Sequence, residues 1–312
     1  MAVGLVVNPV AGGGRMRREL PAIKAALTPH FPDLDVRETQ APGDAARLAC
    51  MLVKDGAGLV IAAGGDGTVS ETVDGLLAAK AEGAAGAQLG ILPVGTGSDL
   101  ARGLGLKGTL GELAGRIASS AGRTLDAARV DFTDDDGALA SRHFINIGSL
   151  GLSGPTDRAV NAVKSSDRMS GKLVFLWHTV RELIRYRFQN VRVTVDDQPP
   201  VEASIALVAC ANSRYFGGGM MIAPDARTDD GLFEVVIVRG RSKLSLLKDL
   251  RLVYSGAHRN LASCTFLRGS NVVVEPLGDP IANGALLDID GESPGRIPAT
   301  FRMVPGAITV RC

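Results

Sequence analysis

Three glycine-rich turns in the first third of the chain, each placed after a strand-like run, constrain the fold more than any other feature. They lie at residues 8–15, 64–68 and 95–99, and helix-forming segments follow them. The expected strands are 4–7, 34–38, 59–63 and 89–92, and the expected helices include 17–27 and 45–54. Such alternation of strands and helices predicts a parallel sheet covered by helices.

The distribution of aromatic residues marks a boundary between two domains. Only Phe31 precedes residue 132, and all other aromatic side chains lie from there onward. The second part has strand-like runs at 190–195, 203–210, 233–238, 271–274 and 286–289, and helical stretches at 172–187 and 243–254. We therefore predict an α/β domain over 1–125 and a β-rich, sandwich-like domain over 126–312. Two last strands, 299–303 and 307–310, fit either domain.

Charge and hydropathy exclude several classes of protein. A formal net charge of +1 gives no field that would attract nucleic acid as the main partner. Apolar runs such as 203–211 reach about half of the roughly 20 residues that a membrane-spanning helix needs. The N-terminus lacks a basic secretory signal, and the four cysteines form no C-x-x-C pair. These features predict a cytoplasmic protein and leave its oligomeric state open, a homodimer included.

The turn Gly64-Gly65-Asp66-Gly67-Thr68 joins a strand-like run to a helical segment. Its glycines let the backbone approach a ligand, and successive amides at a helix N-terminus offer partial positive charge to phosphate. A carboxylate among such amides indicates a nucleotide with a metal ion. The alternative is an ordinary turn in which Thr68 and Glu71 form the capping box of the helix.

The other two turns repeat this arrangement. The second, Gly95-Thr96-Gly97-Ser98-Asp99, also follows a strand, and the first contributes Asn8. Parallel strands bring such loops to one carboxyl edge of the sheet, where α/β folds bind ligands. The P-loop, dinucleotide-binding and protein-kinase signatures are absent. The sequence therefore predicts a nucleotide site of another kind.

These motifs, in this order, resemble the diacylglycerol kinase catalytic-domain family, which includes bacterial soluble lipid kinases and the sphingosine and ceramide kinases. The resemblance covers nearly the whole chain. It is carried by Asn8-Pro9, Gly64 to Thr68, Gly95 to Asp99, Pro224-Asp225, Asp229-Asp230-Gly231 and Asp290-Gly291-Glu292. It implies a kinase that transfers the γ-phosphate of ATP to a lipid hydroxyl, with an ATP-binding domain followed by a lipid-binding domain.

The resemblance also implies roles for particular residues. Those expected to bind ATP are Asn8, Thr39, Gly64, Gly65, Asp66, Gly67, Thr68, Val69, Ser70 and Thr96. Those expected to hold a Mg²⁺ ion are Asp230, through its carboxylate, and Arg227 and Leu232, through their carbonyl groups. The general base would come from Asp290 or Glu292.

Taken without the resemblance, both acidic turns have ordinary explanations, because acidic residues are common at strand ends and in turns. Phosphoryl transfer to an alcohol nevertheless needs a group that accepts the hydroxyl proton, and a carboxylate can do this. The G-x-S-x-G at 291–295 precedes a strand-like run rather than the helix that a nucleophile elbow requires. A serine hydrolase is therefore excluded.

The segment 158–192 carries eight Lys or Arg residues and two acidic ones, a local charge of 8 − 2 = +6. Its apolar run 173–177 beside Arg181, Arg185 and Arg187 fits an anionic membrane surface. An amphipathic helix packed on its own domain is the alternative. We predict a peripheral protein at the inner membrane surface. Two other functions stay open, a kinase for a soluble substrate such as NAD and a non-catalytic nucleotide or lipid sensor.

Overall fold

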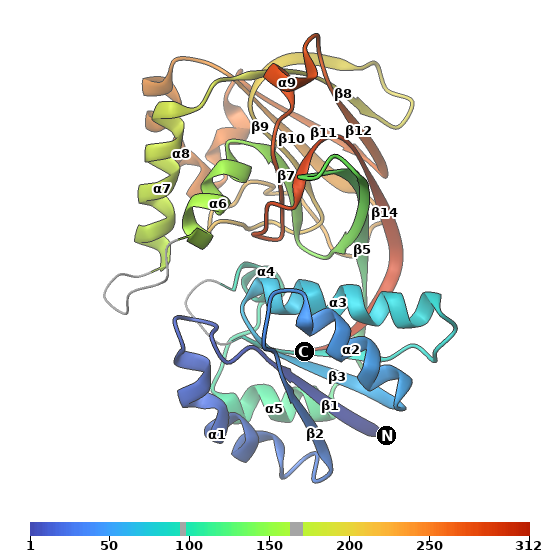
Figure 1. Ribbon diagram of the computed structural model, residues 1–312. Helices are drawn as coiled ribbons and strands as arrows, with labels where there is room; N and C mark the ends of the chain where they lie inside the picture. The colour runs from blue at the N-terminus through green and yellow to red at the C-terminus, as the bar shows by residue number, and fades with distance from the viewer. Residues whose placement is uncertain (94–97, 163–170) are drawn as a thin grey trace. The chain divides into compact units, whose positions relative to one another are not determined.

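The computed structural model describes residues 1–93, 98–162 and 171–312 of the chain (Figure 1). The described residues form two compact units. Unit 1 comprises 1–126 with 305–312, and unit 2 comprises 127–162 with 171–304. Two strands, β5 (Arg123–Asp134) and β14 (Gly295–Arg311), have residues in both units.

Unit 1 is a parallel sheet with helices on both faces, as predicted (Figure 1). Its other strands are β1 (Ala2–Val7), β2 (Leu34–Glu38), β3 (Ala57–Gly64) and β4 (Gln88–Pro93). Its helices are α1 (Arg15–Leu27), α2 (Asp44–Lys54), α3 (Asp66–Ala81), α4 (Asp99–Gly103) and α5 (Leu110–Ser119). The strand order is β14-β4-β3-β1-β2. Helices α2 and α3 lie on one face, and α1 and α5 on the other.

Burial on both faces explains the sequence of the central strand. Residues 59–63 of β3 are fully buried, because helices cover both sides of the sheet. Helix α3 also approaches α2 closely at Gly75, where an added Cβ would lie 2.1 Å from the Ala46 carbonyl oxygen. This close contact fixes α3, the helix that follows the Gly64–Thr68 turn.

Unit 2 is β-rich and built from antiparallel pairs around β9. Its strands, besides those shared with unit 1, are β6 (Leu139–Phe144), β7 (Ile147–Gly151), β8 (Gln189–Val195), β9 (Val201–Ala211), β10 (Phe233–Arg239), β11 (Cys264–Gly269), β12 (Asn271–Pro276) and β13 (Leu287–Ile289). Its helices are α6 (Ser153–Ala162), α7 (Gly171–Arg185), α8 (Lys243–Ser255) and α9 (Pro280–Asn283), with a 3₁₀ turn at Ala257–Asn260.

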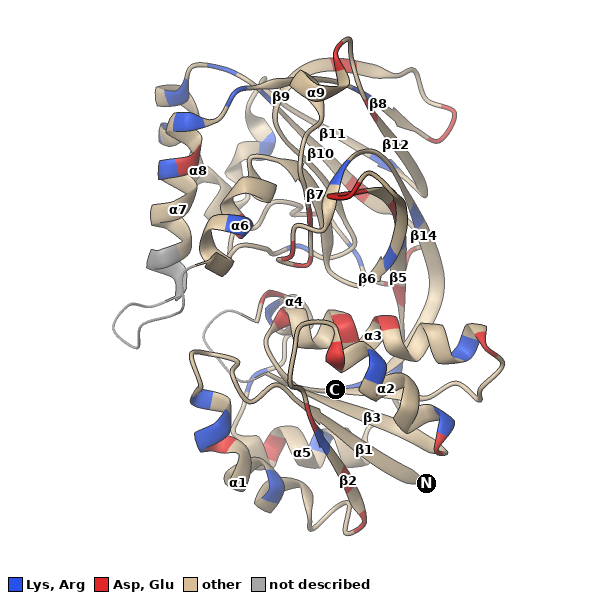
Figure 2. Ribbon diagram, in the orientation of Figure 1, with Lys and Arg blue, Asp and Glu red and all other residues tan. Residues whose placement is uncertain are grey.

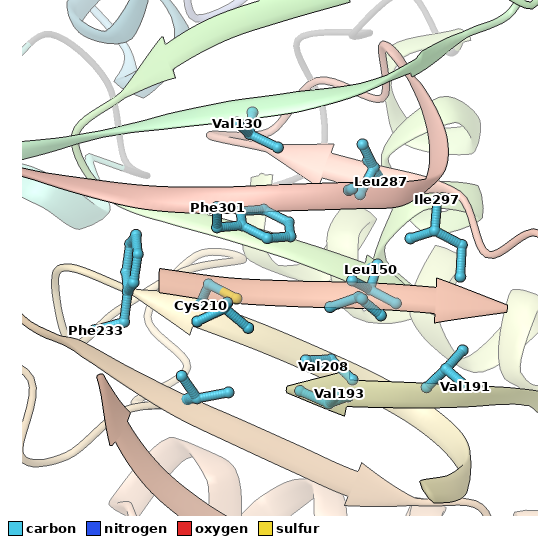
Figure 3. Close-up of a cluster of buried hydrophobic side chains, with 14 of the residues drawn as sticks. Val130, Leu150, Val191, Val193, Val208, Cys210, Phe233, Leu287, Ile297 and Phe301 are labelled. Atoms are coloured by element: carbon cyan, nitrogen blue, oxygen red, sulfur yellow. The ribbon is translucent and has the colours of Figure 1, made fainter. Parts of the chain in front are cut away.

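The main core of unit 2 lies on one face of β9 and β10. Val208, Cys210 and Phe233 belong to this cluster together with Phe301 of β14 (Figure 3). Alternate residues such as Ala209 point to the other face, where a second, smaller cluster forms. One face of these strands therefore packs into the main core of unit 2, and the other face lies toward the helices.

The two last predicted strands are a single long strand, β14. The chain continues through Pro305 and Gly306, and Gly306 has a φ of 58°. The Gly306 amide donates to the Asp126 carboxylate at 2.8 Å. Strands β5 to β7 and β11 and helices α5, α6 and α9 were not predicted. Polar residues and glycines interrupt the patterns of β5 to β7 and α6.

Candidate functional site

Strands β1, β2 and β3 reach the same level with their carboxyl ends, at one edge of the unit 1 sheet. Val7 pairs with Glu38 of β2 and with Ala63 of β3. The Asn8 amide donates to the Ala63 carbonyl at 3.4 Å, and the Thr39 amide donates to the Val7 carbonyl at 2.8 Å. The structure therefore brings Asn8 and Thr39 beside the glycine turn that ends β3.

This glycine turn leaves the N-terminus of α3 without a side-chain cap. Gly65 occupies the capping position in an extended conformation, with φ −86° and ψ −175°. A Cβ on Gly65 would meet no heavy atom within 4 Å, whereas one on Gly64 would lie 2.5 Å from Thr68 Oγ1. Uncapped amides at a helix N-terminus are donors that phosphate binds. The turn thus has space and donors for an anion.

The remaining residues predicted to bind ATP are placed differently. Gly67 is the second residue of α3, and Val69 and Ser70 follow it with buried side chains. The Val69 amide donates to the Gly65 carbonyl at 3.2 Å, and binding of ATP by these two residues stays a prediction. Thr96 lies within 94–97, outside the described residues.

Asp66 has a role that the sequence analysis missed. Its carboxylate accepts the amides of Asp99 at 2.8 Å and Leu100 at 3.2 Å, with Ser98 Oγ at 3.4 Å. These donors lie at the N-terminus of α4, and a carboxylate at a helix N-terminus stabilises the helix. Asp66 therefore joins the turn before α3 to the start of α4, and its charge is balanced by these donors.

The capping box expected at Thr68 and Glu71 does not form, because α3 begins at Asp66. The buried Glu71 carboxylate instead accepts the amides of Gly43 and Ala45, both at 3.0 Å. These amides open α2. The alternative that gave Glu71 a structural role is therefore right about the role and wrong about the partner.

We expect Glu71→Ala to lower the free energy of unfolding by about 1 to 3 kcal/mol for each amide left without an acceptor. Urea unfolding measures the loss. The control is Glu82→Ala, which removes a solvent-exposed ion pair with Lys54 and should cost less than about 1 kcal/mol. Equal losses in the two variants would contradict the role of Glu71.

The Asp290-Gly291-Glu292 turn follows β13 in unit 2. The Asp290 carboxylate is buried and accepts three successive backbone amides. The donors are Ile145, Asn146 and Ile147, at 3.1, 3.2 and 2.8 Å. Asp290 itself has a φ of 50°, in the left-handed region. Its carboxylate therefore anchors the turn onto the start of β7.

Glu292 is the more accessible of the two predicted acids. Its side chain is 35% exposed, whereas Asp290 is 7% exposed. Its Oε2 lies 2.5 Å from the guanidinium group of Arg142 on β6. On α6, Asn161 Nδ2 donates to the Gly291 carbonyl at 3.0 Å. The structure thus holds both acids in one turn and separates them by exposure.

A second pair of acids beside the turn was missed by sequence reasoning. Asp157 of α6 and Asp288 of β13 are both buried, and each carboxyl group affects the pKa of the other. Asp288 also accepts from Ser149 Oγ at 2.9 Å and from the Gly291 amide at 3.0 Å. Burial raises the pKa of both carboxyl groups, and the neighbouring Asp288 raises the pKa of Asp157 further.

Two buried oxygens near the turn have no hydrogen-bond partner among the described residues. They are Asn146 Oδ1 and Ser213 Oγ. The Asn146 amide bonds to Asp290, and the Ser213 amide donates to the Asn146 carbonyl at 3.1 Å. Buried polar atoms without partners call for an explanation such as a bound ligand or ordered water. These atoms could accept or donate hydrogen bonds to a polar group next to the turn.

The predicted metal ligands lie in and around the 229–231 turn. The Asp230 carboxylate accepts the Leu232 amide at 3.2 Å and forms an ion pair with Arg268 of β11. Within 1–93, 98–162 and 171–312, no three His, Cys, Asp or Glu residues form a group that could hold a metal ion. A guanidinium group already balances the one carboxylate. Binding of Mg²⁺ by the Asp230 carboxylate with the carbonyl groups of Arg227 and Leu232 stays a prediction.

An apolar cavity of about 110 Å³ lies on the helical side of the unit 2 sheet. Helices α6, α7 and α8 and strands β9 and β10 all contribute to its wall. Lining residues include Leu152, Phe175, Leu183, Leu207, Leu250 and Val253. Such a wall suits a hydrocarbon group better than a polar ligand.

Comparison with protein families divides the chain in two. Residues 2–130 match the diacylglycerol kinase catalytic domain, and residues 149–312 match the YegS C-terminal NAD kinase beta sandwich-like domain. The chain is 27% identical over 309 residues to a diacylglycerol kinase of Mycobacterium tuberculosis, which covers 99% of this chain and 94% of the relative. It is 25% identical over 299 residues to that of Bacillus subtilis, covering 95% and 91%.

Solved structures show the same relationship. A crystal structure of a candidate diacylglycerol kinase from Bacillus anthracis matches with a TM-score of 0.76 and 27% identity, covering 99% of this chain and 96% of that one. A yeast NADH kinase in complex with NADH matches with a TM-score of 0.50 and 11% identity, covering 99% and 82%. The second likeness shows the fold alone.

Proposed function

The chain belongs to the diacylglycerol kinase family, and from this premise we propose that it transfers the γ-phosphate of ATP to a hydroxyl group of a lipid. Diacylglycerol is the first candidate, because the relatives are named for it. Sphingoid and other glycerol lipids are the next. The apolar cavity of unit 2 is the observation that carries the lipid part of the proposal.

ATP would bind to unit 1. Its phosphates would lie on the uncapped amides at the start of α3, next to Asn8 and Thr39 at the sheet edge. We expect Mg²⁺ to enter as part of the ATP complex, since phosphoryl transfer requires its charge. Asp66 would keep the two glycine-rich turns in a fixed relation while the nucleotide binds.

The acyl part of the lipid would occupy the cavity of unit 2. Helix α8 supports this, because none of its residues is buried although Leu246, Leu250 and Val253 line the cavity. Apolar side chains that line a cavity and are still partly exposed are stabilised when a hydrocarbon chain covers them, because apolar surface is removed from water. A bound acyl chain would supply that covering.

The acceptor hydroxyl would lose its proton to the acidic turn. Glu292 is the accessible carboxylate and is our candidate for the base, while Asp290 holds the turn in place. The oxygens of Asn146 and Ser213 would bind polar groups of the lipid head. These assignments give each of the two predicted acids a separate task.

Labelled ATP offered with micelles of diacylglycerol, sphingosine, ceramide and phosphatidylglycerol, and separately with NAD, tests the proposal. Label transferred to one of the lipids is the expected result. Transfer to NAD alone would favour the soluble-substrate kinase. ATP binding without transfer to any acceptor would favour the sensor.

We also propose that α7 and α8 face a membrane. The exposed face of α7 carries Trp177 and Ile184, each 65% exposed, together with Arg181 and Arg185. These positions follow helical spacing, so they share one side of the helix. Figure 2 shows basic positions along α7. Helix α8 adds the exposed Leu244. No helix among the described residues is long and apolar enough to cross a bilayer. The exposed apolar and cationic side chains of α7 and α8 fit attachment to the surface of a membrane.

We expect reversal of Arg181, Arg185 and Arg187 to glutamate to weaken binding to anionic vesicles at low salt. Each cation near an anionic surface contributes about 1 kcal/mol, so the loss should be at least a hundredfold in partition. Co-sedimentation measures it. The control reverses Arg17, Arg18 and Lys24 of α1, an equal change in charge. Equal weakening of vesicle binding by both variants would contradict the proposal that α7 lies at the membrane surface.

A further inference from the structure

Arg142 occupies a position on β6 where an apolar residue is expected. Side chains alternate along a strand, so Arg142 shares one face of β6 with Ala140 and Phe144. Phe144 belongs to the main core of unit 2, and Ala140 packs against this core. Val130 of β5, which pairs with Arg142, is also buried in it (Figure 3). A charged residue therefore extends from the apolar face of its strand.

Stability does not explain an arginine at this position. Arg142 Nη1 donates to Glu292 Oε2 at 2.5 Å, and both side chains are partly exposed. Ion pairs that water reaches contribute little to stability, and apolar residues often replace partly buried pairs without loss. The presence of Arg142 is better explained by what its guanidinium group binds.

The backbone of Glu292 is fixed more firmly than its ion pair. The Ile289 amide donates to the Glu292 carbonyl at 2.7 Å, and the Glu292 amide donates to the Ile289 carbonyl at 3.1 Å. Between them Asp290 and Gly291 have φ values of 50° and 89°, as in the two-residue turn of a tight β-hairpin. The long side chain of Arg142 is therefore the partner that can move.

Proton transfer to Glu292 would change the partner of Arg142. A general base lies about 2.6 to 3.2 Å from the hydroxyl oxygen whose proton it takes. In the transfer this O–H bond breaks, an O–P bond forms, and the bond between the γ-phosphorus and ADP breaks with its electron pair left on ADP. The phosphate thus arrives beside Glu292 in the step that neutralises the carboxylate. A new anion is then within reach of the guanidinium group.

We propose that Arg142 exchanges Glu292 for the phosphoryl group and then holds the phosphate of the product lipid. Arg142 is thereby a further catalytic residue, because its guanidinium group would touch the group that is transferred. A planar guanidinium can bond to phosphate through two parallel N–H groups, and such donors stabilise the charge of a transferring phosphoryl group. The catalytic part rests on the proposed function, whereas binding of a lipid phosphate can be measured without ATP.

Calorimetric titration of the whole chain with dihexanoyl phosphatidic acid, and with dihexanoylglycerol for comparison, tests the binding. Both lipids are used below the concentration at which they form micelles, so no anionic surface is present to bind α7. The parent should prefer the phosphate lipid. Arg142→Gln should abolish this preference, a loss of about ten- to a hundredfold, because hydrogen bonds between charged groups are the strong ones. Arg142→Met, which keeps an unbranched apolar stem, should do the same.

Arg158→Gln is the matched control, because Arg158 supports the same turn from α6. Its Nε donates to Ser293 Oγ at 3.0 Å, and its Nη2 donates to Asp135 Oδ1 at 2.7 Å. The control removes an equal charge and should keep the preference for the phosphate lipid. Equal binding losses in Arg142→Gln and Arg158→Gln would reduce Arg142 to a structural role and overturn the proposal.

Transfer of label from ATP to diacylglycerol micelles measures the catalytic part. Arg142→Gln should lower kcat about 10² to 10³ with little change in KM, as expected for a donor that acts on the transition state. Arg142→Lys should recover part of this loss through its charge but not through paired hydrogen bonds.

A parent without the preference for the phosphate lipid would overturn the proposal. An Arg142→Gln protein that kept this preference, or kept a measurable parent rate of transfer, would overturn it too, and the proposed function would stand wherever the parent transfers label. If the preference depends on Arg142 while no protein phosphorylates any lipid, the phosphate site stands and the proposed function fails.

Discussion

Glu292→Gln is expected to lower phosphate transfer by about 10² to 10⁴, the usual effect of removing a general base. The glutamine keeps the size of the side chain and can still accept from Arg142, but it cannot take up the hydroxyl proton. The folded protein should keep its melting temperature. ATP affinity should also be unchanged, because the predicted nucleotide residues lie in unit 1. Initial rates with labelled ATP and lipid micelles measure the loss.

Asp290→Asn is the necessary companion. Its new amino group would face the backbone amides of 145–147, and a buried donor without an acceptor costs about 1 to 3 kcal/mol. This variant should therefore lose stability as well as transfer, whereas Glu292→Gln should lose transfer alone. A Glu292→Gln protein that transferred phosphate at the parent rate would leave Asp290 as the base. If both variants transferred at that rate, the base would lie elsewhere, with Asp66 and Asp99 the next candidates.

The second large effect is expected at Gly65. Valine there should weaken ATP binding about ten- to a hundredfold, because its side chain would displace a phosphate from amides whose hydrogen bonds to a charged group are worth about 1.5 to 3 kcal/mol. The fold should not suffer, since the backbone of Gly65 is extended and an added Cβ meets nothing within 4 Å. Calorimetric titration with ATP measures the affinity.

Gly64→Ala separates the two kinds of effect. An added methyl group at Gly64 would lie 2.5 Å from Thr68 Oγ1, so this smaller change should reduce the stability of the protein. Gly65→Val should leave stability alone and reduce affinity. If Gly65→Val bound ATP as tightly as the parent, the phosphate would not lie on the amides at the start of α3.

Local sequence patterns were sufficient to predict most of the elements. The apolar run 59–63 is a buried strand because helices cover both faces of its sheet, and such runs are visible in sequence. The order of the glycine and acidic motifs was sufficient to indicate the family, which the comparisons confirm. Periodicity failed at α6, where Gly154, Pro155 and several polar residues hide a helix whose buried side is itself polar.

The candidate site was predictable only in part, because several of its contacts join residues far apart in the chain. Asp66 is a motif residue, but nothing near it in sequence shows that it caps α4. Asp157 lies in a segment with no predicted element, Asp288 lies two residues before the Asp290 motif, and only the fold brings their elements together. Asp290 was predicted from its motif, whereas no sequence signal indicates that the backbone amides of 145–147 donate hydrogen bonds to it.

The long last strand has a consequence for the order in which the chain can fold during synthesis. Val310 and Arg311, at the end of β14, pair with Leu89 and Gly90 of β4 and complete the parallel sheet. Val310 is fully buried there. A ribosome that has released the first 126 residues has therefore released a sheet in which β4 is still an edge strand, unpaired on one side. Until residues 310 and 311 pair with β4, this edge is exposed to pairing with other chains.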